Sequence, residues 1–152
     1  RAALRLPVLR GFVRDAETAR FAHTLGTLLG AGVALPSALS VAGGSLTNRA
    51  FTAAADAVAV EVRRGAGLAA PLAAAGLFPP VAVQLVRVGE ESGQLAAMLQ
   101  QVADLHERIL QRNVARALAL LVPALTVALG GAVAGIVATV LSAILSVNNL
   151  IA

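Results

Sequence analysis

Apolar residues in the first three quarters of the chain recur three and four positions apart, a spacing typical of amphipathic α-helices. Glycine and proline separate these segments, and no segment shows sustained alternation of apolar and polar positions. The pattern therefore predicts an all-α fold, a six-helix antiparallel bundle with short connections. The clearest apolar stripes are Phe21, Leu25, Leu28 and Leu29, and Phe51, Ala55, Val58 and Val62.

Capping and breaking residues predict where the helices begin and end. Asp15 can cap the first helix, which Gly30 and Gly32 end, and Thr47 or Asn48 can cap the third helix. The other expected starts are Pro36, Leu68, the Pro79–Pro80 pair and Gln94, and the other expected ends are the Gly43–Gly44 pair, Gly65 and Gly76.

The same periodicity indicates which side chains face the core of the bundle. Phe78, between the fourth and fifth helices, is expected to plug the core, and Leu85 and Val88 to face inward from the fifth helix. The sixth helix carries a seam suited to antiparallel packing or to pairing with another subunit. That seam consists of Leu95, Met98, Val102, Leu105 and Ile109.

No ionisable side chain occurs from Ala117 to Val147, a run rich in Leu, Val, Ala, Gly and Ile. A bilayer core about 30 Å thick needs roughly 20 such residues as a helix. We therefore expect residues 117–147 to form a transmembrane helix that continues from the sixth helix. The remaining divisions are an Arg-rich juxtamembrane linker over 1–14, the helix bundle over 15–116, and a short tail over 148–152.

Three arginines, Arg108, Arg112 and Arg116, lie four residues apart just before this apolar run. Their aliphatic stems can lie along lipid while the guanidinium groups reach the headgroups, so we expect them to anchor the helix. The alternative is an ordinary solvated helix face. No charge follows the apolar run, so the positive-inside rule places the bundle in the cytoplasm and the tail on the other side of the membrane.

The apolar run also has a face of small residues, among them the pair Gly131 and Gly135. Small residues let helix backbones approach closely in a membrane, which favours packing against other spans. The alternative is an ordinary anchor in an alanine-rich protein.

Composition narrows the classes of function. The chain has twelve arginines, no lysine and no cysteine, with a formal net charge of +4. The arginines are dispersed and aromatic residues make up only 3%, which argues against nucleic-acid binding. A P-loop requires a lysine to reach the phosphates, so nucleotide hydrolysis by this chain is not expected.

Metal and acid–base chemistry find little support in the sequence. His106-Glu107 opens like a zinc-protease motif, but Leu110 stands where the second histidine belongs. His106 and His23 are expected to be surface residues or satisfied bundle residues. A cluster of Glu90, Glu91, Asp104 and Glu107 remains an alternative site for a hard cation such as Ca²⁺. No catalytic arrangement or cofactor site is recognisable, and the sequence predicts that the chain is not an enzyme.

The stretch Val86–Leu95 contains Gly89-Glu90-Glu91-Ser92-Gly93 and resembles the signature of the type II secretion system protein F family, which includes the platform proteins of type IV pili. Further similarities cover nearly the whole chain. They are Arg20-Phe21-Ala22 in the first helix, Leu77-Phe78-Pro79-Pro80, and the closing Val147–Ile151.

This resemblance implies the second of two cytoplasmic domains and the last of three membrane spans of an inner-membrane platform without its own catalysis. Such a platform acts between a cytoplasmic secretion ATPase and pseudopilins or pilins, beside other inner-membrane components, and a homo-oligomer is expected. The tail favours type II secretion over type IV pili or tight-adherence systems. A transporter or channel fragment is a further alternative, although the span lacks charged residues to serve a substrate or an ion.

The motif residues Arg20, Gly89, Glu90, Glu91, Ser92 and Gly93 carry the resemblance, and two interpretations of them stay open. In one, Gly93 adopts a left-handed conformation that ends the fifth helix, and Glu90 or Glu91 pairs with Arg20. In the other, a carboxylate faces outward to receive the ATPase.

A basic pair at the end of the third helix is a candidate docking point. Arg63 and Arg64 can receive an acidic surface of a partner protein. The alternative is that the two arginines only stabilise the negative end of the helix dipole.

Overall fold

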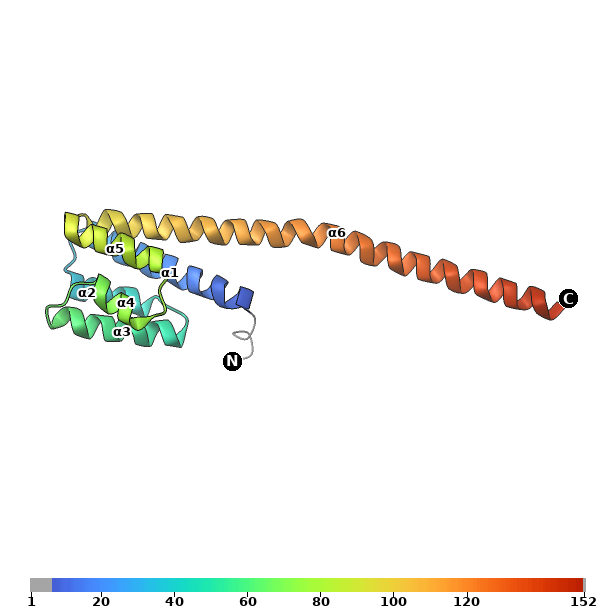
Figure 1. The fold of residues 1–152 in the computed structure, drawn as a ribbon, viewed down its shortest axis with the longest axis horizontal. Helices are drawn as coiled ribbons and strands as arrows, with labels where there is room; N and C mark the ends of the chain where they lie inside the picture. Colours follow the sequence, from blue (N-terminus) through green and yellow to red (C-terminus); the bar gives the residue numbers. More distant parts are fainter. Residues whose placement is uncertain (1–6, 152) are drawn as a thin grey trace. The chain divides into compact units, whose positions relative to one another are not determined.

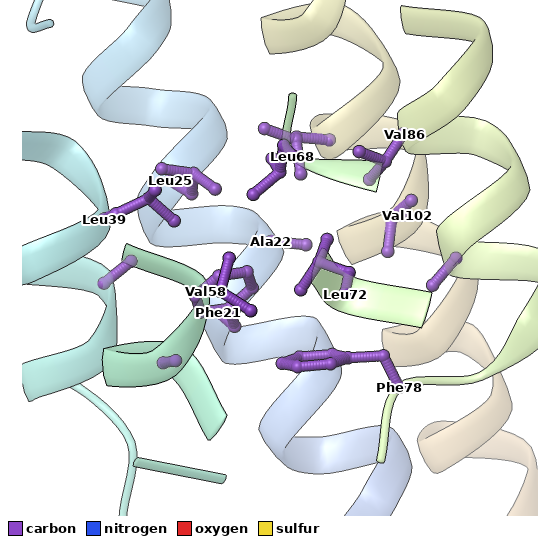
Figure 2. Packing of buried hydrophobic residues seen from close by; sticks show 14 of the residues in the cluster. Phe21, Ala22, Leu25, Leu39, Val58, Leu68, Leu72, Phe78, Val86 and Val102 are labelled. Carbon is purple, nitrogen blue, oxygen red and sulfur yellow. The ribbon is translucent and has the colours of Figure 1, made fainter. Parts of the chain in front are cut away.

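The computed structural model describes residues 7–151, which form six α-helices and, within that range, no strand. The helices are α1 (Pro7–Gly30), α2 (Leu35–Gly44), α3 (Arg49–Arg63), α4 (Ala69–Ala75), α5 (Pro80–Ser92) and α6 (Leu95–Ile151). The chain divides into two units at Arg112–Asn113, a helix bundle and a single stretch of α6. In the bundle, α1 lies between α2 and α3 on one side and α5 and the start of α6 on the other (Figures 1 and 2).

Most of the expected helix ends are confirmed. The side chain of Asn48 caps α3 by accepting the backbone N–H of Ala50 at 2.9 Å. Gly65 ends α3 with a left-handed φ of +97°, a conformation that glycine adopts without a steric penalty. Backbone N–H groups of Gly65 and Ala66 satisfy the last carbonyls of α3, at Val62 and Glu61, in the pattern of a Schellman motif.

The expected start of the first helix at Asp15 is wrong. Helix α1 begins at Pro7, so residues 7–14, expected as a linker, are helical, while residues 1–6 lie outside the described part of the chain. Proline suits the first turn of a helix because its missing N–H would have no partner there. Asp15 does not cap α1; it lies within the helix and contacts His106 on α6.

Phe78 fills the centre of the bundle, as predicted. Its ring centroid lies 5.2 Å from that of Phe21 and 5.4 Å from that of Phe51, the second pair meeting edge to face. Such contacts add about 0.5–1.5 kcal/mol per pair beyond the burial of apolar area. Figure 2 shows Phe21 on α1 and Phe78 in the α4–α5 loop pointing toward each other. The predicted stripe of α3 is likewise buried, at Phe51, Ala55, Val58 and Val62.

The inward faces of α5 and α6 differ from the predicted ones. Val88 is 50% exposed, so the prediction that it faces the core is wrong, whereas Leu85 is partly buried against the core. Leu105, in the predicted seam of the sixth helix, is 37% exposed, and pairing of that seam with another subunit stays a prediction. Consecutive residues of a helix point about 100° apart, and burial of Val86 and Gly89 therefore leaves Val88 outside. The core-facing residues of α6 are Leu99, Val102, Ala103 and His106.

The second unit is one uninterrupted stretch of helix α6. The prediction that the sixth helix continues into the apolar run is confirmed, because α6 passes through Pro123 and ends at Ile151. An 18-residue window of Leu95–Asn148 reaches a mean hydropathy of 2.2, and none of it is buried. By length and composition, this helix can cross a membrane.

Candidate functional site

Glu90, in the motif near the end of α5, caps another helix. Its carboxylate accepts the backbone N–H of Leu68 and, at 3.1 Å, that of Ala69. The first N–H groups of a helix have no partner within the helix, and a negative charge at that end is favourable. Glu90 therefore fastens the start of α4 to the end of α5.

Gly67 leaves the space that the Glu90 carboxylate occupies. A Cβ atom on this residue would lie 2.8 Å from Oε1 of Glu90, too close without a shift of the carboxylate. No sequence motif described above predicts this role of Gly67. The available signal was a second glycine, two residues after Gly65, immediately before a short helix.

Two further glycines bring the first turns of α6 close to its neighbours. A Cβ on Gly89 would lie 2.9 Å from the Cα of Leu95 and 2.9 Å from the Cβ of Met98. A Cβ on Gly26 of α1 would lie 3.1 Å from the Cβ of Leu99. The glycine of the motif is therefore required by the close contact between α5 and α6.

The end of the motif forms the turn between these two helices. Gly93 has a left-handed φ of +70° and ends α5, as the sequence predicts. The N–H of Gln94 donates to the carbonyl of Gly89 at 2.9 Å, and the N–H of Gly93 to that of Glu90 at 3.4 Å. Ser92 is the exposed last residue of α5, and α6 begins at Leu95. The motif thus reverses the chain direction between α5 and α6.

The expected ion pair between Arg20 and Glu90 or Glu91 is absent from the described residues, and that prediction is wrong. Arg20 instead binds Glu17, with 3.2 Å between Nη1 and Oε1, and donates to the hydroxyl of Thr47 at 3.1 Å. The carboxylate of Glu90 is occupied by the backbone of α4. Glu91 is exposed, and within residues 10–148 its side chain has no hydrogen-bond or ion-pair partner.

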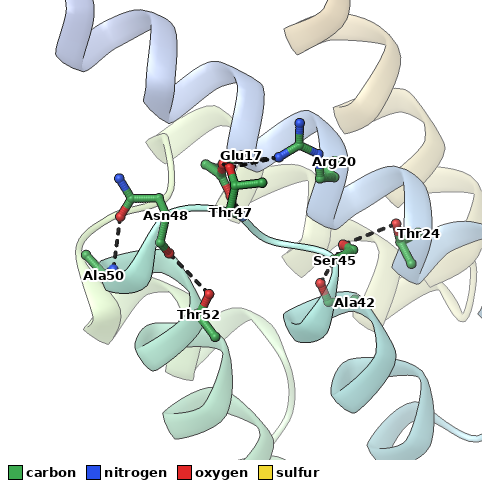
Figure 3. A network of polar contacts seen from close by, with 9 residues as sticks. All are labelled: Glu17, Arg20, Thr24, Ala42, Ser45, Thr47, Asn48, Ala50 and Thr52. Carbon is green, nitrogen blue, oxygen red and sulfur yellow. Dashed lines mark hydrogen bonds and ion pairs between the residues drawn. The ribbon is translucent and has the colours of Figure 1, made fainter. Parts of the chain in front are cut away.

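The contacts of Arg20 belong to a polar network centred on Glu17, which is only 3% exposed. The Glu17 carboxylate accepts the backbone N–H of Thr47 at 3.0 Å and also the Thr47 hydroxyl. Figure 3 shows this network at the loop between α2 and α3, beside the Asn48 cap. Glu17 therefore holds α1 to the segment that starts α3, a role that the sequence analysis missed.

Two other side chains of α1 bind distant parts of the bundle. Arg14 donates to the carbonyls of Leu77 at 2.9 Å and Phe78 at 2.8 Å, which fixes the α4–α5 loop. Asp15 contacts Nδ1 of His106 at 2.9 Å, which joins α1 to α6. His106 is 3% exposed, so it is a buried bundle residue rather than a surface one. Its Nδ1 is paired with Asp15, but its Nε2 is buried without a hydrogen-bond partner among the described residues, so the expectation of a satisfied bundle residue holds for only one ring nitrogen.

The candidate docking pair Arg63 and Arg64 is exposed at the end of α3. Arg64 forms an ion pair with Glu61, with 2.9 Å between Nη1 and Oε1. Arg63 lines a shallow groove of about 360 Å³ beside Pro36 and Val41 of α2. Docking of an acidic surface at this pair stays a prediction.

The residues expected to act in the membrane all lie on α6. Arg108, Arg112 and Arg116 are exposed, and their anchoring role stays a prediction. Gly131 and Gly135 are exposed as well, and a Cβ on either would meet no atom within 4 Å. In the part of the chain that the structure describes, nothing packs on this glycine face.

The alternative cation site at Glu90, Glu91, Asp104 and Glu107 is not formed. Glu90 is bound to the backbone of α4 instead. Across residues 7–151, no group of three or more His, Cys, Asp or Glu side chains is placed to hold a metal ion.

Residues 21–143 match the model of the family described as Type II secretion system (T2SS), protein F. Type II secretion system protein F of Xanthomonas campestris pv. campestris is 42% identical over 78% of this chain and 29% of its own length. Its namesake in Pseudomonas aeruginosa is 38% identical over 78% of this chain and 28% of its length.

A pilus assembly protein is similar at nearly the same level. Type IV pilus assembly protein PilC of Pseudomonas aeruginosa is 35% identical over 80% of this chain and 32% of its own length. The chain thus spans about a third or less of the length of these relatives. Because the family match extends from α1 through the bundle and along most of α6, this chain belongs to the type II secretion system protein F family.

Proposed function

We propose that this chain is the second cytoplasmic domain and last membrane span of an inner-membrane platform protein of a type II secretion system. The platform couples a cytoplasmic secretion ATPase to assembly of the pseudopilus and to protein export. One observation carries the proposal: a single family match covers both the bundle and the apolar helix that continues from it. The names of the relatives at 42% and 38% identity support the secretion system.

The proposed role is mechanical rather than catalytic. Three buried or partly buried polar side chains join parts of the bundle: Glu17 contacts the α2–α3 loop, Arg14 the α4–α5 loop, and Glu90 the start of α4. A domain connected in this way can transmit displacement between its surfaces. The energy for that displacement comes from the ATPase partner.

The proposed orientation places the bundle in the cytoplasm and the end of α6 in the periplasm. Arg108, Arg112 and Arg116 directly precede the apolar stretch. Positive charge beside a span favours the cytoplasmic side, which supports this orientation. A reporter fused after Ala152 tests it, because alkaline phosphatase is active only in the periplasm.

Assembly of type IV pili is the second candidate function. It is favoured by the 35% identity to PilC over 80% of this chain, close to the values for the secretion proteins. Deletion of the parent gene in its own host separates the two. Loss of protein export with intact pili supports secretion, whereas loss of pili with intact export supports pilus assembly.

Co-purification tests the partners directly. The full-length parent protein is purified from membranes with and without residues 15–116. Recovery of a secretion ATPase and pseudopilins only when these residues are present supports the proposal. Recovery of neither, together with a solute or ion flux that depends on the protein, contradicts it in favour of a transporter.

A further inference from the structure

A groove of about 540 Å³ lies in the bundle between the first turns of α1, the start of α3 and the α4–α5 loop. We call it the α1–α3 groove. Its lining includes Arg10, Val13 and Arg14 from α1, Ala50 and Phe51 from α3, and Leu77 from the loop. A volume of this size accommodates several side chains of a binding partner. None of the functional interpretations above uses it.

The charged side chains that line the groove are both arginines, and no carboxylate lines it. Arg14 donates to two neutral carbonyls, and Arg10 is exposed. Neither forms an ion pair with a carboxylate in the described part of the chain. The acidic residues that follow on α1 are engaged elsewhere, Asp15 with His106 and Glu17 with Thr47. The groove is therefore a positively charged recess without internal compensation.

The same recess has an apolar component. Val13 and Leu77 are half-buried, and Phe51 lies beneath at 5% exposure. A free inorganic anion would satisfy the arginines but would make no use of this apolar surface. A ligand that fits both components carries a carboxylate next to an apolar group.

We propose that the α1–α3 groove binds a segment of a partner protein that presents an Asp or Glu side chain beside an apolar side chain. The residues of this chain that precede α1 are not complementary, because they contain Arg1 and Arg5 and no acidic residue. The proposal deepens the proposed function by giving the chemistry of one partner contact. It rests on that function only in requiring a protein partner.

Two short peptides serve as probes: acetyl-Glu-Leu-Glu-Phe-amide and its neutral analogue acetyl-Gln-Leu-Gln-Phe-amide. The full chain is held in uncharged detergent micelles, and peptide binding is followed through the amide NMR signals of Ala50, Gly76 and Leu77. The acidic peptide is expected to shift these signals, more weakly at high salt because screening acts on exposed charges. The neutral analogue is expected to shift them at least threefold less at equal concentration.

Arg10→Gln is the test variant, since Arg10 is exposed and makes no hydrogen bond within residues 10–148. It should weaken binding of the acidic peptide by about twofold to fivefold, the upper part of the range of one exposed charge pair. Arg63→Gln removes an exposed arginine outside the groove and should leave binding unchanged. Arg14 is unsuitable, because it also holds the α4–α5 loop.

Equal binding of the two peptides, equal loss in both arginine variants, or shifts confined to other amides would overturn the proposal. Nanodiscs test the lipid alternative. If phosphatidylglycerol shifts the groove amides relative to phosphatidylcholine and the acidic peptide does not, the groove binds lipid headgroups instead. Protein export is measured in parallel, so that the groove proposal and the proposed secretion function can fail separately. If export depends on this chain but the acidic peptide does not bind, only the groove proposal is contradicted.

Discussion

Glu90 and Leu68 meet at the start of α4, where the side chain of one accepts the backbone N–H of the other. The contact joins two residues that are 22 positions apart and closes the loop of chain formed by α4 and α5. The first glutamate of the family-like motif is therefore a structural cap. Glu91, exposed on the same helix, is the one free to meet a partner.

Replacing Glu90 and Glu91 separately should distinguish these roles. Glu90→Gln removes the charge that caps α4, and we expect a loss of about 1–2 kcal/mol in the free energy of unfolding. Glu91→Gln should change that free energy by less than about 0.5 kcal/mol, because the residue is exposed. Thermal denaturation of the detergent-solubilised chain measures both, and equal losses would contradict the assignment of the cap to Glu90.

Gly67→Ala should destabilise the bundle through Glu90. The added methyl group would lie 2.8 Å from Oε1 and displace the carboxylate from its backbone donors. We expect a cost of about 1–3 kcal/mol, within the range of overpacking and of a lost cap. Gly11→Ala is the matched control, because a Cβ there meets nothing within 4 Å in helix α1. A melting temperature lowered as much by the control as by Gly67→Ala would refute this mechanism.

Gly89→Ala should separate α5 from α6. The new Cβ would lie 2.9 Å from the Cα of Leu95, and backbone atoms move less readily than the end of a flexible side chain. We expect a loss of about 1–3 kcal/mol in the free energy of unfolding. Chemical denaturation measures it, and the additional substitution Met98→Ala should recover little, because the contacts with the Cα of Leu95 and the Cβ of residue 98 both remain. Full recovery would mean that the Met98 side chain beyond its Cβ sets the spacing.

Replacing Glu17 should destabilise the bundle much more than replacing Arg20, although the two residues form one ion pair. Arg20 has a side chain that is 43% exposed, and exposed pairs contribute about 0–1 kcal/mol, so Arg20→Ala should be mild. Glu17→Ala removes a buried acceptor and leaves the backbone N–H of Thr47 without its partner, which costs about 1–3 kcal/mol. Equilibrium unfolding measures the free energy of unfolding of both variants. A larger loss in Arg20→Ala than in Glu17→Ala would mean that Arg20, not Glu17, is the central residue of this polar network.

Exchange of Gly131 and Gly135 for leucine should weaken helix association in the membrane. Leucine at both positions would hold a neighbouring backbone away from this face of α6. A membrane two-hybrid assay measures association, with Leu129→Ala, a change outside the glycine pair, as the control. An unchanged signal in the double leucine variant would exclude this face as the contact.

Helix ends were the most predictable part of the fold, because glycine and proline act through local backbone geometry. Gly65, Gly76 and Gly93 end their helices with positive φ, and Pro80 begins α5. The start of α1 was missed because Asp15 resembles a cap in sequence but is committed to a tertiary contact. Local signals do not reveal which of two roles a polar residue serves.

The side-chain connections of the junction were much less predictable. Periodicity places Val86 and Gly89 on one face, but it cannot tell that Glu90 caps α4 or that Arg20 turns toward Thr47. The hydrogen-bond partners of these side chains depend on which unpaired polar groups lie nearby once the helices have packed. The burial of His106 is equally hard to predict from the local sequence, because its partner Asp15 is 91 residues away in the chain.

Three polar contacts of α1 with later parts of the chain have a fixed order during synthesis. Glu17 meets Thr47 30 residues later in the chain, Arg14 meets Leu77 63 residues later, and Asp15 meets His106 91 residues later. Translation runs from the N-terminus, so these contacts become available in that sequence. The apolar part of α6 emerges from the ribosome directly after His106. The contact between Asp15 and His106 therefore becomes possible just before the long hydrophobic helix emerges.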